Sequence, residues 1–213
     1  DRHNYIQFLF PIRESGMSSA QPLSKYESEI FQKDEKMKQR IIKSYEMMLD
    51  FYGMILVDKN TGQVARNEKT YKERYRHLNW SSHNYLRITR ILKCLGLVGL
   101  EKFKKPFLKH VIEEVFRHEE LEMKASLVKF WLPTLRHEKE LIEMEKLIEE
   151  ITGKRVSRKL YDKEKRTWAN ICYPIDPSKY KKETFYDRDE GDDLDSEDII
   201  NLGERWFKKR KKR

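Results

Sequence analysis

Residues 79–101 carry the pattern that most restricts what this chain can fold into. Their apolar side chains recur at spacings of three, three, one and three: Tyr85, Ile88, Ile91, Leu92 and Leu95. A single apolar stripe near this period predicts an amphipathic helix with one buried face. Ser81 or Ser82 is placed to cap its start, because a serine oxygen accepts a backbone N–H of the first turn. Gly96 is placed where a left-handed residue would end it.

Three basic residues, Arg87, Arg90 and Lys93, lie between the apolar positions and are spaced three apart on another face. One interpretation of this basic row is a solvated helix face. The other is a docking face for an acidic partner. The spacing is the same in both cases, so the sequence leaves both open.

The helical period extends over most of the first 153 residues. Residues 5–10 are dense in aromatic side chains and suit a short buried helix or a buried strand, of which we prefer the helix. Ser24 and Glu27 form a capping box, Asp34 can cap the long apolar stripe that follows, and Gly53 can end it. Further stripes run through residues 71–80, 106–116, 121–132 and 141–151. We therefore predict an all-α fold, a compact bundle of six to seven helices, for a domain spanning residues 1–153.

Residues 55–65 break this helical pattern. Two short β-prone runs flank a loop that contains asparagine and glycine, which favours a hairpin. The alternative is an irregular loop. Pro133 must kink or end the helix predicted over residues 121–132, because proline cannot donate to the helical ladder.

Four stretches of the chain, in order, resemble the opioid growth factor receptor family. They are HNYIQFLFPIRESG from residue 3, YEMMLDFYG from residue 45, DKNTGQVAR from residue 58 and SHNYLRITRILKCLGLVGLE from residue 82. The resemblance implies a nuclear protein that binds a short opioid peptide of the met-enkephalin type and negatively regulates cell proliferation. The family segment that usually precedes HNYIQ, with its tryptophan and acidic residues, is absent here, so we interpret the chain as a fragment.

Composition limits the classes of protein that this chain can represent. Charged residues make up 38% of it, and the net charge of +9 permits acidic partners or nucleic acid without specifying either. Cys94 and Cys172 are the two cysteines, too few for a disulfide framework or a four-cysteine metal site, which favours a reducing compartment. No apolar run has the length of a transmembrane helix, which excludes a heptahelical opioid receptor.

Residues 154–213 carry alternating basic and acidic blocks, which predict a charged, partly disordered tail. It ends in an unbroken basic hexamer: Lys208, Lys209, Arg210, Lys211, Lys212 and Arg213. Such a run predicts a nuclear-import signal read by an import adaptor, or a nucleic-acid patch. The alternative is a solubilising tail, or one folded back on the acidic residues 187–198. With the family resemblance, we expect the protein in the nucleus and perinuclear region and also in the cytoplasm.

Enzymatic chemistry finds no support in the motifs. There is no G-x-G-x-x-G or Walker A loop, and no two histidines have the i, i+4 spacing of a helical zinc site. We expect no catalytic residue, no cofactor and no metal. Cys94 is interpreted as a buried structural thiol, since only Lys93 nearby would lower its pKa. Adjacent carboxylates such as Glu113 and Glu114 are interpreted as surface charge, because neighbours on a helix do not face each other.

Two functional hypotheses follow. The first is a peptide-binding protein, because a short peptide with an N-terminal amine and aromatic side chains needs a carboxylate and aromatic walls. Two neighbourhoods of the sequence offer these groups, one with Asp50, Phe51 and Tyr52 and the other with Tyr71, Tyr75 and Trp80, although both also suit a core. The second is a nucleic-acid or chromatin-associated scaffold that uses the basic row and the basic tail. Affinity that falls steeply with salt would favour the second.

Overall fold

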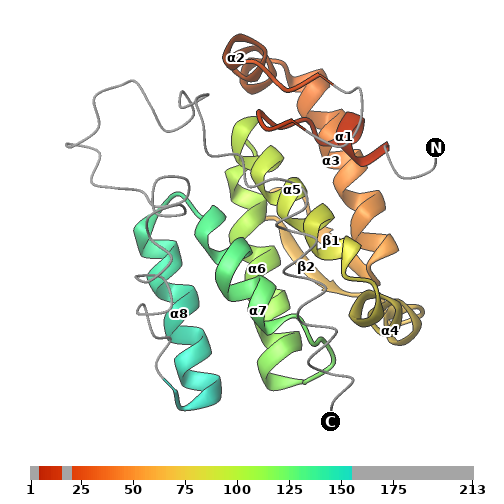
Figure 1. The fold of residues 1–213 in the computed structure, drawn as a ribbon, viewed down its shortest axis with the longest axis vertical. Helices are drawn as coiled ribbons and strands as arrows, with labels where there is room; N and C mark the ends of the chain where they lie inside the picture. Colours follow the sequence, from red (N-terminus) through yellow and green to blue (C-terminus); the bar gives the residue numbers. More distant parts are fainter. Residues whose placement is uncertain (1–4, 16–20, 155–213) are drawn as a thin grey trace.

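The stretch over residues 79–101 forms the central helix of the fold, α5 (His83–Leu97), as its apolar stripe predicts (Figure 1). The computed structural model describes residues 5–15 and 21–154. In α5, the side chains of Ile88 and Ile91 are 1% and 3% exposed, and Leu92 is fully buried. These side chains belong to one continuous apolar core to which all the long helices contribute. The prediction that both isoleucines are buried is confirmed.

The described residues contain eight α-helices and one antiparallel hairpin, which confirms the all-α class with its single hairpin. The α-helices are α1 (Tyr5–Leu9), α2 (Lys25–Lys33), α3 (Glu35–Phe51), α4 (Tyr71–Trp80), α5, α6 (Lys104–Ile112), α7 (Lys124–Ser126) and α8 (Glu138–Thr152). The strands are β1 (Met54–Asp58) and β2 (Gln63–Arg66). The count exceeds the expected six to seven because it includes the three-residue helix α7.

Local capping chemistry places the start of α2 and α3 where the sequence predicts them. Glu27 N donates to Ser24 Oγ at 3.2 Å, and Ser24 N donates to Glu27 Oε2 at 2.8 Å, so the capping box is complete. Asp34 Oδ1 accepts the first free backbone N–H groups of α3, the nearer at 2.8 Å. At Gly53, φ is +82°, and a Cβ there would lie 2.8 Å from Arg74 Cβ. Glycine is therefore required where the chain turns from α3 into β1 beside α4.

Both predicted ends of α5 need correction. Ser82 occupies the N-cap position, but its side chain makes no capping hydrogen bond. Gly96 lies inside the helix, and the left-handed glycine is Gly99, with φ +77°. The reason for a glycine at 96 is space, because a Cβ there would lie 2.7 Å from Lys104 Nζ. Lys104 is 2% exposed, and its ammonium is held by the Glu101 carboxylate at 2.7 Å.

The continuous helix predicted over residues 121–132 is wrong. Leu121 is buried, but it follows a turn in which Glu119 has a positive φ of 54°. The chain then forms only one α-helical turn, α7, and continues as the π-helical segment η3 (Leu127–Trp131). A second π-helical segment, η2 (Glu113–Arg117), extends α6. Pro133 ends this region within the short 3-10 turn η4 (Leu132–Thr134), as expected.

The N-terminal segment, residues 5–15, contacts α5, which lies in the middle of the fold. Figure 1 shows α3 and the hairpin on one side, α8 on the other, and α5 and α6 between them.

Within the described ranges, no helix combines the length and apolar character needed to cross a membrane. Helix α8 ends at Thr152 and is followed by Gly153 in the left-handed conformation. All of the predicted charged tail, residues 154–213, except Lys154 lies outside the described residues, so the domain boundary at 153 stays a prediction.

Candidate functional site

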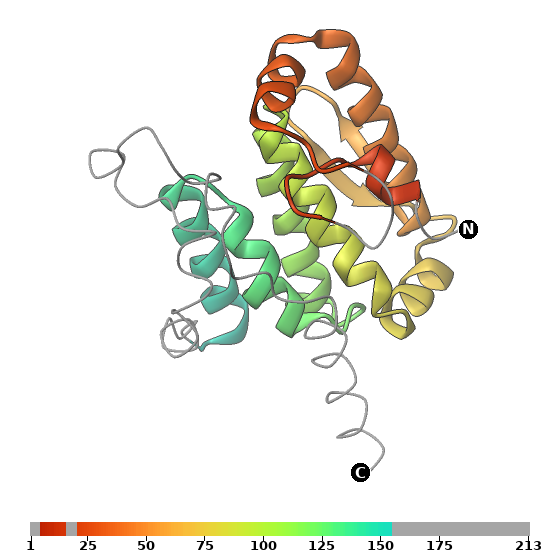
Figure 2. The same ribbon diagram turned by 45° about the horizontal axis from the view of Figure 1, so that its top comes forward.

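The basic row on α5 contacts a segment of the same chain. Residues 5–15, which we call the strap, cross α5 (Figure 2). Arg90 Nε donates a hydrogen bond to the carbonyl oxygen of Phe10 at 2.9 Å. The Arg87 guanidinium carbon lies 5.6 Å from the centre of the Tyr5 ring, a cation–π contact. The Phe10 side chain is fully buried, so apolar burial holds the strap together with these polar contacts.

The third residue of the row, Lys93, forms an ion pair with Glu14 of the strap. Burial by itself raises the pKa of Glu14, but the charge and hydrogen bond of Lys93 outweigh it and hold that pKa below its usual range. Burial also lowers the pKa of Arg90, against the opposing effect of the Glu14 carboxylate. The row therefore already faces a carboxylate and a backbone carbonyl, both supplied by the chain itself.

The contacts with the strap bear on both interpretations of the basic row, the solvated helix face and the docking face, but do not decide between them. All three basic side chains contact the strap, so the row is not a bare solvated face. An acidic partner from outside the chain would have to compete with Glu14 for Lys93. Docking of such a partner stays a prediction. The basic hexamer at residues 208–213 lies outside the described residues and stays a prediction as well.

A second candidate surface lies where the end of α3 meets α4. We call it the α3–α4 corner and define it by Met47, Asp50, Phe51 and His77. The Phe51 and His77 rings meet edge to face, with centroids 5.9 Å apart. Asp50 is exposed, and its Oδ1 accepts a hydrogen bond from Asn67 Nδ2 at 3.1 Å. Met47, one turn before Phe51, is 50% exposed. The corner thus combines an accessible carboxylate with apolar and aromatic side chains.

The other aromatic residues of the two predicted neighbourhoods are mostly core. Tyr52 and Tyr75 are 2% and 1% exposed, and Tyr71 packs edge to face on Tyr75 with centroids 5.6 Å apart. Trp80 is different, because 82% of it is exposed at the end of α4. The two neighbourhoods therefore meet where Phe51 contacts His77 of α4. The tyrosines contribute to the packing of the core and not to an exposed surface.

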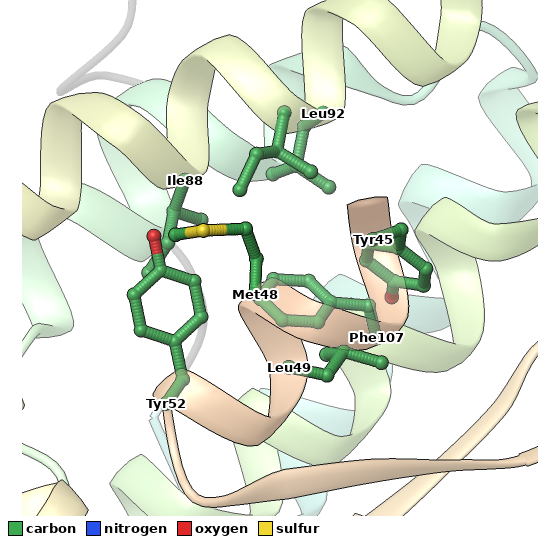
Figure 3. Close-up of a pocket in the computed structure, with 8 residues that line it drawn as sticks. Tyr45, Met48, Leu49, Tyr52, Ile88, Leu92 and Phe107 are labelled. Atoms are coloured by element: carbon green, nitrogen blue, oxygen red, sulfur yellow. The ribbon is translucent and has the colours of Figure 1, made fainter. Parts of the chain in front are cut away.

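The interior offers no room for a peptide side chain at the cavity between α3, α5 and α6 (Figure 3). Its volume is about 10 Å³, roughly that of one water-sized sphere. It is lined by Tyr45, Met48, Leu49, Tyr52, Ile88, Ile91, Leu92 and Phe107. The Tyr45 and Tyr52 hydroxyls make no hydrogen bond within the described residues, and burial raises the pKa of both. This cavity therefore does not admit a peptide side chain, and we look for a peptide site on the surface.

A buried polar cluster connects β2, α4, α6 and η2. Arg66 binds Glu114 through two hydrogen bonds, Nε to Oε1 at 2.7 Å and Nη2 to Oε2 at 2.6 Å. His110 Nε2 lies 3.0 Å from Tyr75 Oη and 3.8 Å from Glu114 Oε1. Burial lowers the pKa of His110, partly offset by the Glu114 carboxylate. The interpretation of Glu114 as surface charge is wrong, because its side chain is 3% exposed. No local sequence signal marks this pairing, since its partners are 48 residues apart.

The structure bears on two chemical expectations. Cys94 is fully buried, as predicted, and burial raises the pKa of its thiol to about 12, so the reactive thiolate is strongly disfavoured. Residues 5–15 and 21–154 contain no group of three or more histidine, cysteine, aspartate or glutamate side chains arranged to hold a metal ion.

Comparison with known proteins gives the family. The opioid growth factor receptor conserved region matches residues 1–158. The human opioid growth factor receptor is 48% identical over 122 residues, which are 57% of this chain and 18% of that protein. Opioid growth factor receptor-like protein 1 of Mus musculus is 45% identical over 140 residues, 65% of this chain and 30% of that protein. Its Xenopus tropicalis counterpart is 46% identical over 136 residues, 63% of this chain and 26% of that protein.

No solved structure matches the chain. The chain spans less than a third of the length of these relatives, so the match concerns their shared conserved region. That region includes the strap, the hairpin and all eight helices described above. On the extent of this match, the chain belongs to the opioid growth factor receptor family.

Proposed function

We propose that this chain is a non-enzymatic binding protein that takes a short opioid peptide of the met-enkephalin type and restrains cell proliferation from the nucleus. The match of residues 1–158 to the conserved region of the opioid growth factor receptor carries the proposal. The human relative is named as the receptor for an opioid growth factor, which supports a peptide as the ligand class.

The α3–α4 corner is the surface on which we place this peptide. An N-terminal ammonium can pair with the exposed Asp50 carboxylate, which accepts a hydrogen bond from the neutral Asn67 amide. An aromatic side chain of the peptide can pack on Phe51 and His77, whose rings already meet edge to face. Met47 adds an exposed thioether, a group that adapts to varied apolar partners.

The test is a titration of the purified chain with an opioid pentapeptide labelled at its C-terminus, so that its amine stays free. We expect saturable binding that tolerates salt. Asp50→Asn should weaken it about 1.5- to 5-fold, since exposed ion pairs contribute about 0.2–1 kcal/mol. Acetylating the peptide amine should weaken it equally, and should have no further effect on the Asp50→Asn variant. Glu35→Gln is the matched control, an exposed carboxylate at the start of the same helix.

Two results would contradict this placement. The first is equal weakening by Glu35→Gln and Asp50→Asn, which would indicate general electrostatics. The second is an additive effect of acetylation on the Asp50→Asn variant, which would show that the amine binds elsewhere. Absence of saturable binding to the unmodified chain would contradict the peptide proposal itself.

Nuclear action rests on the basic hexamer in our proposal. We expect the hexamer, fused to a cytoplasmic reporter too large to diffuse through the pore, to carry it into the nucleus, because import adaptors read extended basic runs. Changing Lys209, Arg210 and Lys211 to alanine should return the full chain to the cytoplasm. A reporter that stays outside, with a mutant that stays inside, would place the signal elsewhere in the chain.

A further inference from the structure

One face of α4 presents an exposed row of basic and aromatic side chains. We call Lys72, Arg76 and Trp80 the α4 stripe. They are spaced four residues apart, which places each about 6 Å further along the same side of the helix. Trp80 has the highest exposed fraction, 82%, among the large hydrophobic side chains of the described residues. The three side chains of the stripe are exposed, whereas Tyr75 and Leu78 of the same helix are buried.

The two cations of the stripe differ from those of the basic row on α5. Arg87, Arg90 and Lys93 all contact the strap, whereas Lys72 and Arg76 form no ion pair within residues 5–15 and 21–154. Both are exposed. Of these two basic surfaces, the α4 stripe is the one that none of the described segments of the chain covers.

Tryptophan and arginine are the residues most enriched at binding hot spots, where a rigid apolar or planar group is covered by a partner. The α4 stripe has the composition of a hot spot, because Trp80, which is 82% exposed, follows the exposed Arg76 by one turn. We infer that the α4 stripe docks an acidic helical segment of a partner protein. The segment that fits carries two carboxylates one turn apart, facing Lys72 and Arg76, and an apolar side chain one turn further, on Trp80.

The charges around the stripe favour such a segment over nucleic acid. Glu73 is exposed beside Lys72 on the same helix. Asn79 also holds an acidic loop next to the end of α4. Its Nδ2 donates to the Glu120 carbonyl at 2.9 Å, and its Oδ1 accepts from the Glu122 backbone N–H at 2.9 Å. An evenly spaced row of phosphates would have to pass Glu73 and this acidic loop, whereas a peptide can place two carboxylates on the two cations and leave its remaining surface neutral.

The test uses the full chain and designed probes. The first probe is an alanine-rich helical peptide with two glutamates four positions apart and a phenylalanine four positions later. The second has the same composition with the glutamates two positions apart, so that they no longer share a face. The third is a single-stranded oligothymidylate. We expect the first probe to bind, measured by fluorescence anisotropy, and the second to bind at least about tenfold more weakly.

Variants then locate the site. Lys72→Glu with Arg76→Glu should abolish binding of the first probe, and Trp80→Ala should weaken it about tenfold or more, as expected of a hot spot. The matched control is Lys36→Glu with Arg40→Glu on α3. These residues are also exposed and one turn apart, and make no ion pair within the described residues. Far-UV circular dichroism should show an unchanged fold in every variant.

Three outcomes would overturn the inference. Equal binding of the two peptides would show that only net charge matters. Equal weakening by the α3 control pair would show that the stripe is not the site. Tighter binding of the oligothymidylate than of the first peptide, falling steeply with salt, would identify a nucleic-acid surface in its place. Each outcome is separate from opioid peptide binding, because no residue of the α3–α4 corner is changed.

Discussion

Replacing Glu114 by glutamine should destabilise the fold by about 3 kcal/mol, because it leaves the Arg66 guanidinium without its anionic partner. Both oxygens of this carboxylate accept hydrogen bonds from Arg66, at 2.7 and 2.6 Å. The pair joins β2 to η2, the segment that extends α6, so its loss removes one of the contacts between the hairpin and the helices. Glutamine keeps the size of the side chain, removes the charge and replaces one acceptor oxygen with an NH2 donor that cannot accept from Arg66.

The magnitude follows from burial. Removing one partner of a buried ion pair costs about 3–5 kcal/mol. The Glu114 side chain is 3% exposed, but Arg66 is 21% exposed and keeps its contact with the Tyr71 ring at 4.7 Å, so the lower end applies. In a domain whose whole stability is about 5–15 kcal/mol, this loss should lower the melting temperature by roughly 10 °C.

Urea denaturation of the full chain, followed by circular dichroism at the helix band, measures the loss. Glu113→Gln is the matched control, because that neighbouring carboxylate is half-buried and forms a longer ion pair, 3.9 Å, with Arg117, which is 53% exposed. It should change stability by less than about 0.5 kcal/mol. The combined variant Arg66→Met with Glu114→Leu should cost less than the sum of the two single changes. A loss below about 1 kcal/mol for Glu114→Gln, or additive single effects, would refute the reasoning.

Three further changes test other parts of the fold. Ile88→Ala should cost about 2–5 kcal/mol, because it empties a core position that is 1% exposed; an unchanged denaturation midpoint would mean that α5 is not the core element. Arg90→Ala should cost about 1.5–3 kcal/mol by releasing the Phe10 carbonyl, against under about 1 kcal/mol for Lys93→Ala, and the reverse order would contradict the contacts of the strap. Because burial lowers the pKa of His110, the unfolded chain takes up a proton below pH about 6.5 that the folded chain does not, so stability present above that pH is lost on acidification. His110→Asn should flatten this acid limb by up to about 1.4 kcal/mol per pH unit, and an unchanged slope would show that another group titrates there.

The features predicted correctly from the sequence are those whose energetics are local. The capping box of Ser24 and Glu27 and the cap at Asp34 depend on groups two or three residues apart, so they are visible in the order of residues. The apolar stripes of α3, α5 and α8 depend on a fixed helical period. The hairpin follows from β-prone runs on both sides of a turn, and its register pairs Leu56 with Val64.

Predictions failed where a distant part of the chain overrode a local rule. Gly96 has the local pattern of a helix end, but it lies within α5, where the absence of a Cβ admits the buried ammonium of Lys104. The stripe over residues 121–132 is apolar at helical spacing, yet the turn at Glu119 and the π-helical geometry of η3 break it. The burial of these apolar side chains was predictable, but the backbone conformation of the segment that carries them was not.

The candidate sites divide in the same way. Helical spacing by itself determined which basic residues share a face of α5, and the resemblance of four stretches indicated the family. Only the tertiary structure decided that the strap covers this face, that Phe51 meets His77, and that Arg66 neutralises Glu114 across 48 residues. The physical reason is that helical period and capping arise within a few residues. Ion pairs and ring contacts between elements depend on which segments the common core brings together.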